Sequence, residues 1–294
     1  MTVFYFAGVK ILLKKTLVIL KNSPMIIVLF VLAIAISAVP IILLLPDINR
    51  IMAFSNEIAK NYGSLTPPDP QQTIQMLMTY LKLGIYSLVT CGIGIVFMAG
   101  FGNMLAAAVN GGKASLKIFI FGIRKFFTKT LLSLLLLVAL IFGFSIIISI
   151  ISVPFTIMSV INSTFDPEAI LGRQRAIQIF SCAMMIFLYP FVELWFPAIF
   201  LERNDGVTAC FRKGLKAGVK KYIILVAVTA VMLLPSLVLF GYVENIYSIM
   251  YSSFYIFTII YQAIVMPVML TYMFMLYNET KKPIRQESVL VQPR

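Results

Sequence analysis

Histidine is absent from this 294-residue chain, and acidic residues are scarce, at 11 Asp and Glu against 24 Lys and Arg. The absence of histidine excludes His-based acid–base catalysis, Ser–His and Cys–His nucleophile pairs, and zinc sites built on imidazole. The three cysteines, Cys91, Cys182 and Cys210, form no CxxC pair, so neither a disulfide framework nor a metal cluster is expected. We therefore expect no catalytic residue, no cofactor and no metal.

Charge of either sign makes up only 12% of the chain, whereas 61% of it is hydrophobic. An ordinary soluble domain has about 25% charged residues. A water-soluble fold cannot bury this much apolar surface, so lipid is the expected solvent. Five uncharged runs, and a sixth interrupted only by Glu193, are long enough to cross a bilayer as helices. We predict an all-α, polytopic membrane protein, one integral membrane domain over 1–294, with six transmembrane helices at 25–46, 83–112, 130–165, 176–201, 222–243 and 245–278.

The basic residues predict how the chain is threaded. Of the 24 Lys and Arg, 19 fall in the segments 1–24, 113–129, 202–221 and 279–294. Because basic residues of short loops stay on the cytoplasmic side, both termini are expected inside the cell membrane, with 279–294 as a cytoplasmic tail. The net charge of +13 then faces anionic lipid headgroups, and no nucleic acid is expected as a partner.

Each odd-numbered span follows a short basic segment with helical periodicity. Apolar and basic residues separate onto two faces, which is typical of helices lying in the inner headgroup layer. A polar linker without special shape is the alternative. The expected apolar faces are Phe6, Val9, Leu13, Leu17 and Leu20; Leu116, Phe119, Ile120, Ile123 and Phe127; and Val207, Phe211, Leu215 and Tyr222. The expected headgroup contacts are Lys10, Lys14, Lys117, Arg124, Lys125, Arg212, Lys213, Lys216 and Lys220.

An internal repeat underlies these basic amphipathic segments. Residues 110–117 align with 205–212 in the pattern Asn/Asp-Gly-x-x-Ala-small-apolar-basic. Asn or Asp followed by Gly allows a sharp turn, and its side chain is expected to cap the next helix. We predict three units of one surface helix and one helical hairpin each, related by a pseudo-threefold axis along the membrane normal. The units are approximately 1–109, 110–204 and 205–278.

The stretch around the boundary between the second and third units resembles a sequence found in a known group of proteins. Residues 196–222 run from an apolar Phe196-Pro197 segment through Glu202 and an Asp205-Gly206 turn into a basic helix that ends at Tyr222. This order is similar to a signature of uncharacterised prokaryotic six-helix membrane proteins, which resemble the membrane domain attached to some glycerophosphodiester phosphodiesterases. The resemblance implies an accessory membrane domain without defined chemistry. It does not carry over the hydrolase activity, because the histidine and clustered carboxylates of such an enzyme are absent.

Ionisable side chains inside lipid are costly and therefore point to function. Glu193 is the clearest case: it lies nine residues before Glu202, or about 13 Å along a helix, and between Pro190 and Pro197, which loosen the backbone ladder. Its repeat counterpart is Met98. A hydrogen-bonded structural Glu is the alternative. Asn103 and Gln262 are expected to be interhelical hydrogen-bond partners or to line a path beside Glu193.

Two further expectations concern the outer side. Lys82, near the outer end of the second span, is expected to extend its ammonium to the headgroups. Residues 47–72 are expected to form a solvated loop with one short helix before the prolines at 67–70.

Three functions compete. The first is a non-enzymatic scaffold or accessory subunit that binds a protein partner on its cytoplasmic face. The second is a permease or flippase for a small or lipidic solute, with Glu193 as its intramembrane site. An interfacial lipid enzyme is the weakest, because no cluster of titratable groups converges near one leaflet. The sequence favours the scaffold. A hydrated cavity that reaches Glu193 would favour the permease, and a sealed, close-packed interior there would favour the scaffold.

Overall fold

The computed structural model describes residues 2–60, 70–161, 186–242 and 253–281. All regular structure in these ranges is helical, which confirms the all-α fold class for the described part of the chain. The helices are α1 (Thr2–Asn22), α2 (Met25–Lys60), α3 (Pro70–Val109), α4 (Leu116–Ile161), α6 (Trp195–Leu201), α7 (Val207–Lys220), α8 (Tyr222–Tyr242) and α10 (Ser253–Lys281).

Two helical stretches, Thr73–Val109 and Ile259–Lys281, are long and apolar enough to cross a membrane. The count rises to four if each of two bent helix pairs is one span. The described residues thus provide fewer candidates than the six predicted spans. One reason is that the fourth predicted span, 176–201, is described only from residue 186, where it forms the short apolar helix Ile186–Leu201.

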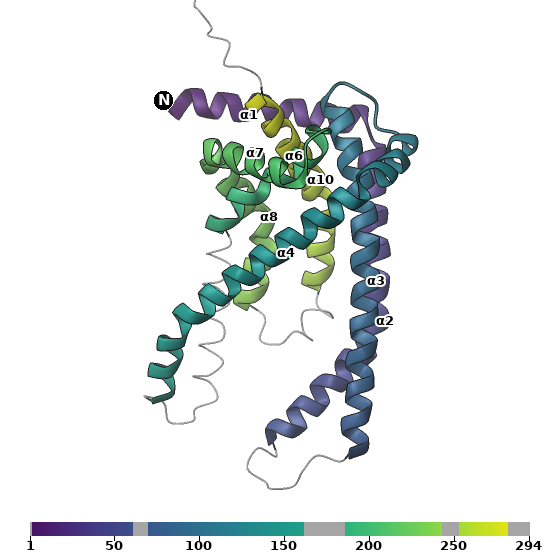
Figure 1. Ribbon diagram of the computed structural model, residues 1–294, viewed down its shortest axis with the longest axis vertical. Helices are drawn as coiled ribbons and strands as arrows, with labels where there is room; N and C mark the ends of the chain where they lie inside the picture. Colours follow the sequence, from purple (N-terminus) through teal and green to yellow (C-terminus); the bar gives the residue numbers. More distant parts are fainter. Residues whose placement is uncertain (1, 61–69, 162–185, 243–252, 282–294) are drawn as a thin grey trace, which may run out of the picture.

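Two of the three predicted surface helices are separate elements that turn sharply into the following helix. The axes of α1 and α2 are bent by 82°, and those of α7 and α8 by 96°. Figure 1 shows α1 and α7 lying across one end of the molecule, while α2 and α3 run away from it. At the first bend Pro24 has no N–H to continue the hydrogen bonds of α1, and the backbone carbonyl of the buried Ser23 accepts from the N–H of Ile26 at 3.0 Å.

The middle predicted surface helix, residues 116–129, is not a separate element. Residues 116–129 continue without a break into the predicted span, so that α4 is one helix from Leu116 to Ile161 (Figure 1). The end of the basic stretch at Lys129 is a change of composition only, and no proline lies there to end the helix. In this respect the middle unit differs from the other two.

The Asn-Gly turns are found where predicted, but the predicted caps are wrong. Gly111 has a φ of +85°, a conformation that favours glycine, and the N–H of Gly112 donates to the carbonyl of Ala107 at 2.9 Å. Helix α4 begins only five residues later, and its first turn is capped by Ser115, whose Oγ accepts from the N–H of Ile118 at 3.4 Å. At α7 the cap position is Gly206, which has no side chain, rather than Asp205.

The buried faces of α1 and α7 differ from the predicted apolar faces. Helix α1 buries Leu12, Thr16 and Leu20 against the bundle and leaves Leu13 and Leu17 exposed. Each surface helix therefore has a face toward the protein, and apolar side chains beside its basic ones remain uncovered. Helix α7 follows the same rule: it leaves Leu215 and Val219 exposed and buries the small residues Cys210, Gly214, Ala217 and Gly218.

The other ends of α2 and α3 extend beyond the predicted spans. The helix expected before the prolines of 47–72 is the end of α2, which continues to Lys60, and α3 begins at Pro70, so the expected loop is wrong at 70–72. Residues 61–69 of that loop lie outside the described residues. Lys82 donates to the buried Asp47 at 3.0 Å instead of extending to headgroups. A buried carboxylate needs a partner of opposite charge, and this pair joins α2 to α3.

An aromatic core lies where α4, α6 and α10 meet. The rings of Phe126 and Phe200 are 5.2 Å apart, and those of Phe196 and Phe274 are 5.7 Å apart. A Cβ atom at Gly102 of α3 would overlap the Phe200 ring, so glycine is required for this approach. The core fixes α6, and with it the helix break that precedes α6.

Candidate functional site

The helix that carries Glu193 breaks immediately after it. Residues 186–193 are helical, Leu194 is a turn residue, and α6 resumes at Trp195. Pro197 has no N–H for the Glu193 carbonyl four residues earlier, and its ring crowds that carbonyl. The loosened ladder predicted from the prolines is therefore present. The break fixes the carboxyl group at a bend in the backbone rather than along a straight helix.

Glu193 is buried, with 4% of its surface exposed. Its Oε2 lies within hydrogen-bonding distance, 3.1 Å, of the hydroxyl oxygen of Thr229 on α8. The same hydroxyl lies 2.8 Å from the carbonyl oxygen of Leu225. The other carboxyl oxygen, Oε1, is buried without a hydrogen-bond partner among the described residues.

A cavity of about 530 Å³ reaches Glu193 and is lined from six helices and the segment before α6. Its volume lies in the range of about 300–1,000 Å³ that small-molecule sites have. Gln262 of α10 lines it, as the sequence allowed, and so does Met98, the repeat counterpart of Glu193. Most of the remaining lining is apolar, and its polar members are Thr130, Ser133, Tyr189 and Trp195.

Four buried polar atoms that lack a hydrogen-bond partner in the described part of the chain belong to residues that line this cavity. Buried polar groups are normally paired, so a cluster of exceptions is informative. The residues are each at most 4% exposed and come from α4, the segment before α6, and α6 itself. The atoms are Thr130 Oγ1, Ser133 Oγ, Glu193 Oε1 and Trp195 Nε1.

Asn103 does not take part in this site. Its Nδ2 donates to the backbone carbonyl of Ile118 on α4 at 2.9 Å, and it is absent from the cavity lining. A Cβ atom at Gly122 would lie 2.6 Å from the Cβ of Asn103 and 2.9 Å from the carbonyl oxygen of Ala99. Asn103 therefore joins α3 to α4 at a close crossing, which is the interhelical role that the sequence suggested.

Helix α7 packs closely against the broken helix, on the side away from the cavity lining that the other helices form. A Cβ atom at Gly214 would lie 2.6 Å from the Cα of Trp195, and one at Gly218 would lie 2.9 Å from the carbonyl oxygen of Pro190. The Trp195 and Phe211 rings meet edge to face with centroids 5.1 Å apart. Small residues at these positions bring a surface helix within backbone contact of the segment that holds Glu193.

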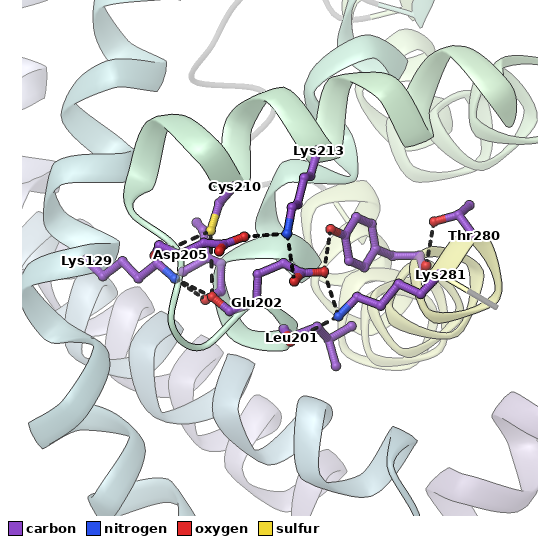
Figure 2. Close-up of polar contacts among 10 residues, drawn as sticks. Lys129, Leu201, Glu202, Asp205, Cys210, Lys213, Thr280 and Lys281 are labelled. Carbon is purple, nitrogen blue, oxygen red and sulfur yellow. Dashed lines mark hydrogen bonds and ion pairs between the residues drawn. The ribbon is translucent and has the colours of Figure 1, made fainter. Parts of the chain in front are cut away.

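A second polar cluster, not identified from the sequence, surrounds Glu202 just after α6 (Figure 2). Glu202 Oε1 lies 2.7 Å from Lys281 Nζ and accepts from the Tyr277 hydroxyl at 3.1 Å, while Oε2 lies 3.2 Å from Lys213 Nζ. Lys129 of α4 donates at 2.9 Å to the backbone carbonyls of both Ile199 and Glu202. The cluster thus ties α4, α6, α7 and α10 together.

The electrostatics of this cluster favour the ionised form of Glu202. Partial burial of the carboxylate raises its pKa, but hydrogen bonds from Lys281 and Lys213 outweigh that effect and hold the pKa below its usual value. Lys213 is also 2.6 Å from Asp205 Oδ2. The only sequence signal was an acidic residue between a predicted span and a basic helix. Its partner Lys281 lies in the expected tail, far along the chain from Glu202, so no local sequence pattern could have paired the two residues.

The nine basic residues expected at headgroups are all exposed. Lys213 differs from the others, because its charge is engaged by Glu202 and Asp205. The Lys125 ammonium lies 5.7 Å from the centroid of the Phe121 ring and 5.8 Å from that of Phe126. The exposed members besides these two are Lys10, Lys14, Lys117, Arg124, Arg212, Lys216 and Lys220.

Over the described residues the fold is all-α, with two to four helices long and apolar enough to cross a membrane. Comparison with protein-family models, with curated proteins and with solved structures yields no match. The resemblance of residues 196–222 to the six-helix group therefore remains an expectation.

Proposed function

We propose that the chain is a six-span protein of the cell membrane with both termini in the cytoplasm. The end that carries α1 and α7 faces the cytoplasm, because the basic residues gather there and because uncovered apolar side chains such as Leu13, Leu17 and Leu215 lie beside them. A basic stripe next to exposed apolar residues suits a helix in the anionic headgroup layer.

We further propose that the protein is a non-enzymatic permease or flippase that takes a small or lipidic solute into its central cavity. The observation that carries this proposal is the cavity of about 530 Å³ that reaches Glu193 and Gln262. A sealed, close-packed interior at Glu193 would have favoured the scaffold. The helix break beside Glu193 is typical of transporter sites, where irregular backbone lines a cavity.

The scaffold or accessory subunit is the second candidate, and the Glu202 cluster favours it. Four elements held together by three lysines and a tyrosine form a stiff platform at the predicted cytoplasmic end. Exposed Lys and Arg of α1 and α7 flank it and would suit an acidic partner. Co-purification in mild detergent tests this candidate: a stoichiometric partner that is lost on substitution of Arg212 and Lys216 supports it.

The cavity is tested by the fluorescence of Trp195, the only tryptophan in the chain, which lines it. Bromododecanol added to the protein in vesicles is expected to quench this fluorescence saturably. Ser133→Phe, which fills the cavity, is expected to abolish the saturable part. Leu135→Phe on the same helix is the matched control, because Leu135 is 56% exposed. Equal quenching in the wild type and in both variants would contradict a solute site in the cavity.

A further inference from the structure

The charge of the cavity restricts what it can hold. Within the described residues, the lining contains one acidic side chain, Glu193, and neither Lys nor Arg. An anionic ligand would find no counter-charge and would approach a carboxyl group in a low-dielectric setting, where unpaired charges are expensive. The field of this site therefore favours a cation.

The walls of the cavity are suited to a cation with an apolar body. Aromatic ring faces attract organic cations that come within about 6 Å of the centroid. The lining contains six aromatic side chains, contributed by α2, α3, α6 and the segment before α6. They are Phe30, Phe97, Phe101, Tyr189, Trp195 and Phe196.

The hydrogen-bond distances around Glu193 indicate which protonation state its carboxyl group takes. The Thr229 hydroxyl has a single hydrogen, and the Leu225 carbonyl at 2.8 Å is nearer to it than Glu193 Oε2 at 3.1 Å. Both contacts are satisfied together when Glu193 carries a proton and donates it to Thr229 Oγ1. Glu193 is then neutral, as a buried carboxyl group without a counter-charge should be.

Few titratable groups other than Glu193 lie near the cavity. Tyr189 is the one other titratable group in the described lining, and α2, α3, α4, α8 and α10 contribute none. Helix α7 contacts the broken helix through Phe211, Gly214 and Gly218, which do not titrate. At the start of α8, Tyr222 does titrate; its ring centroid lies 4.8 Å from that of Phe191, and its hydroxyl donates to the Phe187 carbonyl at 3.0 Å.

We propose that the cavity binds a lipophilic organic monocation, an ammonium group on an apolar body, with the Glu193 carboxylate as its counter-ion. The inference rests on the proposed function, in which this cavity is the solute site. As the cation enters, Glu193 releases its proton to the surrounding water, so the charge inside the cavity stays unchanged. Each bound cation is thereby exchanged for one proton, and no other reactant is needed.

Two probes that share an apolar body but differ in head group test this proposal. Bromododecyl-trimethylammonium and bromododecanol are titrated against the Trp195 fluorescence of the full chain in zwitterionic vesicles. Near neutral pH the wild type is expected to bind the ammonium compound about tenfold more tightly, which corresponds to roughly 1.4 kcal/mol. Glu193→Gln is expected to remove this preference and to leave alcohol binding intact. Glu279→Gln, at an exposed acidic residue of α10, is the matched control.

A pH-indicator dye gives an independent reading on the wild type. Addition of the ammonium compound is expected to release close to one proton for each cation bound, whereas the alcohol releases none. This reading decides the question if Glu193→Gln does not fold. Equal affinities for both probes, a preference that survives Glu193→Gln, or cation binding without proton release would overturn the inference and leave the cavity as a site for neutral solutes. Absence of saturable quenching by either probe would instead remove the proposed function itself.

Discussion

Glu193 and Met98 line the same cavity from two different predicted repeat units, at positions that correspond in the repeat. One unit thus supplies an apolar thioether where another supplies a carboxyl group. The two units therefore differ in the side chain that they contribute to the lining of one cavity.

This relationship predicts a rescue by relocation. Glu193→Met is expected to lower the affinity for the ammonium probe about tenfold, the cost of losing one favourable charge contact. Adding Met98→Glu returns a carboxyl group to the cavity and is expected to recover most of that loss. Trp195 quenching measures both variants. A double variant no better than Glu193→Met would mean that the position of the carboxyl group matters more than its presence.

The contact of α7 with the broken helix predicts a strong effect of one methyl group. Gly214→Ala places a Cβ atom 2.6 Å from the Cα of Trp195, which is backbone and cannot rotate away. Overpacking of this kind costs about 1–3 kcal/mol. We expect lower thermal stability and a shifted Trp195 emission maximum. Gly206→Ala is the control, since a Cβ atom there meets nothing within 4 Å. Identical behaviour of the two variants would contradict the close approach of α7.

The Glu202 cluster predicts a defined dependence of stability on pH. The pKa of Glu202 is held below its usual value in the folded state, so its contribution is present above the unfolded pKa and is lost as pH falls through the folded pKa. At neutral pH, Glu202→Gln is expected to cost about 1.5–3 kcal/mol, as for hydrogen bonds to charged groups. Between about pH 5 and pH 3, the wild type should lose stability more steeply than the variant. Thermal melts of both proteins in detergent measure this. If their melting temperatures differ by the same amount at every pH, this role of Glu202 is refuted.

Asn103 is expected to affect stability without affecting solute binding. Asn103→Ala removes the hydrogen bond that the amide donates to the partly buried Ile118 carbonyl, at a cost of about 1–2 kcal/mol. Because Asn103 does not line the cavity, the affinity for both amphiphilic probes should remain at the wild-type value. A melting curve and a Trp195 titration on the same sample separate the two effects. Weakened probe binding at unchanged stability would place Asn103 in the solute path after all.

Composition was enough to predict the helical class, and the two-faced basic segments predicted that α1 and α7 precede the next span as surface helices. The prolines around Glu193 predicted the loosened backbone there, because the effect of a residue such as Pro197 on the backbone does not require knowledge of the rest of the fold. The continuity of α4 was missed, because a change from basic to apolar composition at Lys129 looks like a boundary but removes no backbone hydrogen bond.

The candidate site was predictable only in part. Glu193 stood out because a charge in an apolar run is costly wherever it lies. Gln262 lines the cavity and Asn103 does not. This difference depends on how each helix is rotated and packed, which the periodicity of the sequence does not specify. The buried faces of α1 and α7 were misassigned for a related reason: a helix between protein and lipid has two apolar sides, and the side toward the protein is here marked by small residues such as Gly214 and Gly218.

Uptake of radiolabelled dodecyltrimethylammonium into vesicles, driven by a proton gradient, tests the role of Glu193 most directly. Vesicles with the wild-type protein or with Asn103→Ala are expected to take up the cation well above protein-free vesicles, and those with Glu193→Gln to match the protein-free level. Uptake by Glu193→Gln equal to that of the wild type, or wild-type uptake no greater than that of protein-free vesicles, would contradict the account.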